Sequence, residues 1–101
     1  MAELREYELL YILRPTLADD AIPPAIDKVN QTVGNLGGEV YEVLQTAPWG
    51  RRRLAYPIDR HTEGYYVVNH LRLEPTQAAG LERLLLISDD VIRHMLVRQD
   101  A

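Results

Sequence analysis

The sequence predicts an α+β domain in which a four-stranded antiparallel sheet carries two helices on one of its faces. Two segments with helical periodicity, residues 17–38 and 74–88, alternate with segments rich in tyrosine and branched apolar residues, which favour strands. The resulting order is βαββαβ, and right-handed crossovers place the first and third strands in the middle of the sheet. This is the ferredoxin-like plan, and a length of 101 residues suits a single domain spanning residues 1–101.

The first strand is predicted at residues 5–15, "REYELLYILRP", and ends at a proline. Alternation places four side chains on one face, Tyr7, Leu9, Tyr11 and Leu13, and four on the other, Glu6, Glu8, Leu10 and Ile12. Both faces become apolar toward the end, which is typical of a central strand. Leu10 and Ile12 are therefore candidate partner contacts on the face without helices. The alternative is that they are half-buried or meet a second copy of the chain.

The first helix is predicted within residues 17–38. Its apolar residues recur at steps of four and three, namely Ile22, Ile26, Val29, Val33 and Leu36. We expect the regular helix to begin near Ile22, because Pro23 and Pro24 are tolerated only in a first turn. Asp19 and Asp20 are candidate caps, and Gly37 with Gly38 provides the stop.

Residues 39–46 form the second predicted strand, and residues 51–58, "RRRLAYPI", continue it after a kink at Pro48 and Gly50. Pro57 indicates an edge strand or a bulge, because proline cannot donate a ladder hydrogen bond. We expect residues 59–64, "DRHTEG", to be a polar loop.

The C-terminal half contains the most strand-like segment, residues 65–73, followed by a helix over 74–88 and a last strand over 90–98. The residues expected to be buried on this helix are Ala78, Leu81, Leu84 and Leu85.

The composition is that of a globular protein without cysteine, and the net charge is −4. The absence of thiols, of a signal peptide pattern and of a membrane-length apolar run leads us to expect a cytoplasmic protein. An acidic balance argues against a broad nucleic-acid surface. However, residues 48–61 contain four arginines and one aspartate, a local charge of +3. This pattern favours a small, defined contact.

No catalytic or cofactor motif is present in the sequence. The histidines His61, His70 and His94 lack metal-site spacing, and no glycine-rich phosphate loop occurs. We interpret His70 as a surface or edge residue. Ser88, Asp89, Asp90 and His94 include the residue types of a catalytic triad, but no nucleophile elbow accompanies them, and a turn is the simpler interpretation. We expect neither a metal nor a cofactor.

The arginine triplet has two interpretations. Charged side chains often protect an exposed strand edge from pairing with other chains. The alternative is contact with RNA phosphates or with an acidic patch on a protein. Composition does not choose between them.

Five segments nevertheless resemble the family of bacterial small-subunit ribosomal protein six. They are "REYELLYILRP", "GGEV", "WGRRRLAYPI", "EGYYVV" and "DDVIRHMLVR", and together they span about residues 4–98 in the family's order. The resemblance implies the ferredoxin-like fold, a structural role without catalysis, and a place in the cytoplasmic ribosome. It also implies pairing with small-subunit ribosomal protein eighteen and binding to the central domain of the small-subunit ribosomal RNA.

The resemblance also implies a set of site residues. We expect RNA contacts at Arg51, Arg52 and Arg53, with Arg93 and Arg98 on the last strand as further candidates. Trp49, Tyr56 and Ile58 would shape the ribbon or contact the partner protein. Two other classes stay open: a regulatory module that binds a small ligand between subunits, and an acyl-phosphate hydrolase, for which Asn35 and Asn69 are poorly placed.

Overall fold

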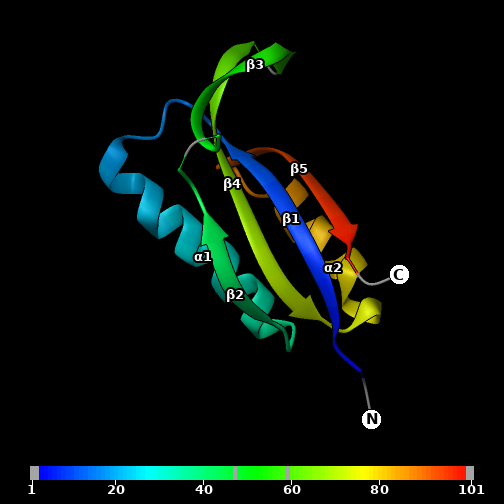
Figure 1. Cartoon of the computed structure of the whole chain (residues 1–101). Coiled ribbons are helices and arrows are strands. Elements are labelled where there is room, and N and C mark those ends of the chain that lie inside the picture. The colour runs from blue at the N-terminus through cyan, green and yellow to red at the C-terminus, as the bar shows by residue number, and fades with distance from the viewer. Residues whose placement is uncertain (1–2, 47, 59, 100–101) are drawn as a thin grey trace.

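The computed structural model describes residues 3–46, 48–58 and 60–99 (Figure 1). Its strands are β1 (Arg5–Leu13), β2 (Glu39–Leu44), β3 (Gly50–Ile58), β4 (His61–Leu73) and β5 (Val91–Arg98). Its helices are α1 (Ile22–Asn35) and α2 (Ala78–Leu86), each preceded by a short 3₁₀ turn, at Asp19–Ala21 and Pro75–Gln77. Neither helix has the length and apolar character to cross a membrane.

The sheet confirms the predicted plan. Its order is β2-β4-β1-β5 with antiparallel pairing throughout, and both helices cover the same face (Figure 1). The first and third predicted strands, now β1 and β4, are the central pair, as expected. The face of the sheet opposite the helices is called the open face below.

The described strands number five rather than four, because β2 and β3 follow one another along the same edge of β4. β2 pairs with residues 68–72 of β4, and β3 pairs with residues 61–66. Gly50 opens β3 at a φ of 89°, and a Cβ there would lie 2.7 Å from the Gln45 carbonyl oxygen, so this kink requires glycine.

The predicted loop over residues 59–64 is mostly wrong. His61, Thr62, Glu63 and Gly64 extend β4, where they form a hairpin with β3. Polar composition suggested a loop, but a two-stranded ribbon that leaves the sheet can be polar and still satisfy its backbone by pairing. Arg60 adopts a φ of 70° at the turn, and residue 59 lies outside the described residues. Pro57 is at an edge beside a register shift, as predicted.

Helix α1 begins at Ile22, as predicted, with Pro23 and Pro24 in its first turn. The expected caps are wrong: Asp19 and Asp20 belong to the 3₁₀ turn, and no side chain caps the helix at Ala21. The proline pair explains this difference, since it leaves fewer N–H groups for a cap to satisfy.

Helix α2 buries Leu81 and Leu85 but leaves Leu84 42% exposed, so the expected burial of Leu84 is wrong. In this nine-residue helix only the positions of Leu81 and Leu85 face the sheet directly, and Leu84 lies at the side of that buried face. Leu86 and Ile87 are also exposed.

The face of the sheet under the helices forms the core. Tyr7, Leu9, Tyr11 and Leu13 are all buried there, which confirms the predicted alternation of β1. Asn69 is fully buried and donates from Nδ2 to Asn30 Oδ1 on α1 at 3.0 Å. Burial raises the pKa of the neighbouring Tyr11 hydroxyl. Asn69 therefore fixes α1 to the sheet and is not placed for chemistry at a surface.

Candidate nucleic-acid and partner interface

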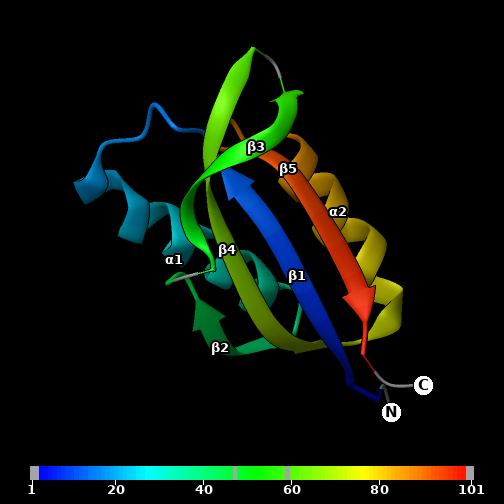
Figure 2. The same cartoon turned by 45° about the horizontal axis from the view of Figure 1, so that its top comes forward.

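The hairpin of β3 and β4 bends over one end of the open face (Figure 2). Gly64 permits this bend, because a Cβ at that position would overlap Ile12 Cγ2 and also meet Leu54. Leu54 on β3 is buried against this contact. The hairpin therefore packs on the sheet through a glycine backbone and one leucine.

The three arginines at the start of β3 point in two directions. In the β3–β4 register, Arg51 is opposite Tyr65, Arg52 is opposite Gly64 and Arg53 is opposite Glu63. Alternation therefore directs Arg51 and Arg53 toward the helix side and Arg52 toward the open side. Their environments also differ.

Arg51 is anchored within the chain. Its guanidinium donates to the Pro15 carbonyl oxygen at 3.2 Å and to Asp19 Oδ1 at 3.4 Å, and it lies 5.9 Å from the Tyr65 ring centroid. Arg52 is exposed and stacks 5.1 Å from the centroid of Tyr66. Arg53 is exposed and makes no hydrogen bond or ion pair with another described residue.

A groove of ≈ 230 Å³ separates the bent hairpin from the end of the sheet. It is lined by Leu10, Ile12, Leu54, Ala55, Tyr56, Ile58, Tyr66, Arg93, His94 and Met95. The structure thus brings together five residues predicted as contacts, since Leu10, Ile12, Tyr56, Ile58 and Arg93 all line this groove. Within this lining, the Arg93 guanidinium lies 5.8 Å from the Tyr56 ring centroid.

The depth of these residues in the groove differs. Leu10 is half-buried and Tyr56 is 57% exposed, but Ile12 is only 6% exposed beneath the hairpin. Ile12 can therefore form the floor of the groove but offers little surface of its own.

Two predicted residues lie elsewhere. Trp49 is in the turn before β3, where its backbone N–H donates to the Thr46 carbonyl oxygen at 2.8 Å, and it does not line the groove. Arg98 is opposite Tyr7 on the helix-covered side of the sheet, whereas Arg93 is opposite Ile12 on the open side. The structure therefore does not bring Arg98 together with Arg93.

The other end of the open face contains a charged cluster that sequence reasoning missed. His70 lies on the central strand β4, with Nδ1 2.6 Å from Glu42 Oε1 on β2 and Nε2 3.2 Å from Glu8 Oε2 on β1. Of the two interpretations offered for His70, an edge position is wrong, and the residue is half-buried on the open surface of the sheet between two carboxylates. Only the register of three strands shows this juxtaposition.

Arg72 extends the cluster by one step along β4. It lies 2.9 Å from Glu39, 3.5 Å from Glu6 and 4.3 Å from the Tyr41 ring centroid, and the hydrogen bond to Glu39 raises its pKa. Tyr41 donates its hydroxyl to Glu6 at 3.2 Å, and partial desolvation together with this bond raises its pKa. Both basic side chains of this cluster are thus paired within the chain, and the four carboxylates outnumber them.

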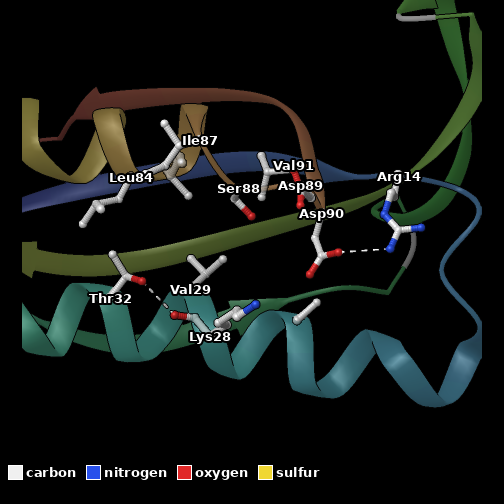
Figure 3. Close-up of a pocket in the computed structure, with 12 residues that line it drawn as sticks. Arg14, Lys28, Val29, Thr32, Leu84, Ile87, Ser88, Asp89, Asp90 and Val91 are labelled. Carbon is white, nitrogen blue, oxygen red and sulfur yellow. Dashed lines mark hydrogen bonds and ion pairs between the residues drawn. The ribbon is translucent and has the colours of Figure 1, made fainter.

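A larger hollow of ≈ 440 Å³ lies on the helix side, between α1 and the segment that joins α2 to β5 (Figure 3). Arg14 and Asp90 form an ion pair of 3.3 Å at its edge. His94 pairs with Glu82 instead of converging on Asp90, so these residues form no triad. Within the described ranges no group of histidine and acidic residues could hold a metal ion.

Comparisons with known proteins identify the family of this chain. A family model described as Ribosomal protein S6 matches residues 6–98. The small ribosomal subunit protein bS6 of Desulforudis audaxviator is 40% identical over 97 residues, covering 96% of this chain and 100% of that protein. Its counterpart from Carboxydothermus hydrogenoformans is 42% identical, covering 96% and 98%. A crystal structure of 30S ribosomal protein S6 from Thermotoga maritima, 23% identical, shares the fold with a TM-score of 0.86 over 96% of this chain and 89% of that one.

Proposed function

The chain belongs to the ribosomal protein S6 family, and we propose that, as a structural component of the small ribosomal subunit, it binds the central domain of the small-subunit ribosomal RNA together with ribosomal protein eighteen. It is not an enzyme, and its place is the cytoplasmic ribosome. One observation supports the proposal above all: the arginines at the margin of an exposed apolar groove, Arg52 and Arg93, pair with no described acidic residue.

The groove supports the part of the proposal that concerns the partner protein. Tyr56, Leu10 and Ile58 offer aromatic and aliphatic surface in a concave site, which is the usual character of a protein contact. Tyr56 is a large ring with more than half of its surface exposed. A partner that fills the groove would remove this apolar surface from water.

The arginines support the part that concerns RNA. Arg52, Arg53 and Arg93 form no ion pair with a described acidic residue, so their guanidinium groups are available for phosphate oxygens. Arg51 is a predicted contact as well, but it also anchors the hairpin. Because only a few arginines would neutralise phosphates and the net charge is −4, we expect the chain alone to bind RNA weakly.

The test is a fluorescence anisotropy titration of a labelled central-domain RNA fragment, with the chain alone and then with protein eighteen. We expect tight binding only when both proteins are present. The double variant Arg52→Ala with Arg53→Ala should weaken binding about 10-fold and lower the slope of log K against log salt by about 1 to 2. Its thermal midpoint should hardly change, because exposed charges contribute little to stability.

The control is Arg83→Ala, which removes an exposed arginine from α2, on the other side of the sheet. It should leave RNA binding unchanged. Unchanged binding of the double variant would contradict the role given to the arginines, and absence of binding with both proteins present would contradict the proposed function itself.

A further inference from the structure

The groove continues into a second hollow, which we call the edge hollow. This hollow of ≈ 560 Å³ lies beside the start of β5, between the end of β3 at Ile58 and the end of α2 at Leu86 (Figure 2). Ile58, Arg93 and His94 line both the groove and the edge hollow. The two hollows therefore form one continuous depression that passes from the open face around the start of β5 to the end of α2.

Strand β5 has a bulge at the passage between the two hollows. In the register of β1 with β5, Arg93 is opposite Ile12. The next pair is Val91 with Leu13, so the register skips Ile92. A bulge of this kind redirects the side chain of the extra residue. Ile92 is half-buried and lines the edge hollow, so the bulge adds an aliphatic side chain to its wall.

The edge hollow combines exposed apolar surface with one unpaired carboxylate. Leu86 lines it and is 74% exposed, more than any other large apolar side chain among the described residues. Asp89 is exposed, and its carboxylate makes no hydrogen bond or ion pair with a described residue. This chemistry favours a protein segment that brings an apolar side chain and a cation. It disfavours RNA, because the carboxylate would repel a phosphate.

We propose that the segment of the partner protein that fills the groove continues around β5 into the edge hollow. There it packs an apolar side chain on Leu86 and Ile92 and pairs a lysine or arginine with Asp89. The inference rests on the proposed function, because it extends the partner site named there. A segment that leaves the groove past Ile58 and Arg93 enters the edge hollow directly, since both residues border both hollows. A partner confined to the groove would leave the exposed surface of Leu86 in water.

The first test measures affinity for ribosomal protein eighteen by isothermal titration calorimetry. Leu86→Ala should weaken binding about 5- to 10-fold, because it removes apolar surface that the partner buries. Its thermal midpoint should hardly change, since the side chain is exposed. The control is Leu84→Ala, which shortens an exposed leucine of the same helix that lines the hollow beside α1 instead, and it should bind normally.

Two outcomes of this titration separate the extended site from the proposed function. If the unmodified chain binds protein eighteen and Leu86→Ala binds it equally well, the proposal is overturned and the proposed function stands. If the unmodified chain does not bind protein eighteen, both are overturned.

The second test concerns the charge of Asp89. Asp89→Asn should weaken binding to protein eighteen about 3- to 5-fold at about 50 mM salt and hardly at all at about 500 mM, because salt screens an exposed ion pair. Asp20→Asn makes the same change at an exposed position before α1 and should leave affinity unchanged. If RNA occupied the edge hollow, Asp89→Asn would instead strengthen binding of the chain to RNA, and that result would overturn the proposal.

The third test locates the partner directly. The chain has no cysteine, so Leu86→Cys can carry a single environment-sensitive fluorophore at the edge hollow. Addition of protein eighteen should shift its emission to shorter wavelength, because the partner excludes water, and the same label at Leu84→Cys should not respond. A shift that grows with the concentration of the labelled chain alone would place a second copy in the hollow and overturn the proposal, as would the absence of a shift when protein eighteen binds.

Discussion

The two ends of the open sheet face differ in how their basic side chains are paired. We call the end around His70 and Arg72 the charged end, and the end around Arg52 and Arg93 the groove end. At the charged end, His70 and Arg72 each contact two carboxylates from neighbouring strands. At the groove end, Arg52 and Arg93 stack on tyrosine rings and pair with no described acid. The charged end therefore pairs its basic side chains with carboxylates of the same chain, whereas the basic side chains of the groove end have no described carboxylate beside them.

This contrast indicates where a partner gains free energy by binding. A ligand at the charged end would have to displace ion pairs that already exist, which costs desolvation without new charge pairing. A ligand at the groove end buries exposed apolar surface and supplies acceptors for arginines. We therefore expect a partner to bind the groove end of this sheet face rather than the charged end.

The largest expected effect concerns the contact that creates the groove end. Gly64→Ala places a methyl group against Ile12, so either the hairpin or the isoleucine must move. We expect a loss of about 2 to 3 kcal/mol in the free energy of unfolding, as is usual for overpacked sites, measured by urea denaturation. Gly80→Ala is the matched control, because its Cβ meets nothing within 4 Å and alanine favours the helix. Equal stability of both variants would show that the hairpin does not rest on Ile12.

A smaller effect should separate the two ends by affinity. Tyr56→Ala removes an exposed ring from the groove and should weaken binding to ribosomal protein eighteen about 30-fold, or about 2 kcal/mol, measured by isothermal titration calorimetry. Tyr41→Ala removes the same side chain from the charged end, where it is 47% exposed, and should leave affinity unchanged. Equal losses from both substitutions would contradict the distinction between the ends.

The sequence predicts most of the fold but little of the difference between the charged end and the groove end. Alternation in β1 and the spacing that begins α1 at Ile22 are local patterns, and the structure confirms both. The opposite directions of Arg93 and Arg98 also follow from alternation, because five is an odd spacing along a strand. The pairing of His70 with Glu8 and Glu42 depends on the register of three strands, and no local pattern encodes it.

The bend of the hairpin depends on tertiary packing in the same way. A polar segment beside Gly64 looks like a loop until the backbone of that glycine is seen against Ile12. The groove is a consequence of this contact. The sequence therefore indicates several of its residues one by one, but it does not show that they line a common site.

The smallest expected effect tests the charged end through its pH dependence. Partial desolvation and the hydrogen bond to Glu6 raise the pKa of Tyr41 above its ordinary value of about 10. A raised pKa means that the contribution of Tyr41 to stability is complete below pH 10 and is lost as the pH rises above it, because the phenolate would face the carboxylates of Glu6 and Glu42. Tyr41→Phe retains the ring beside Arg72 but cannot ionise. We therefore expect the urea midpoint of the variant to fall less than that of the unmodified chain between pH 9 and pH 11, roughly one unit to either side of the ordinary value. An equal fall in both proteins would mean that Tyr41 ionises as freely in the folded chain as in the unfolded one, and its hydrogen bond to Glu6 would then contribute nothing to stability.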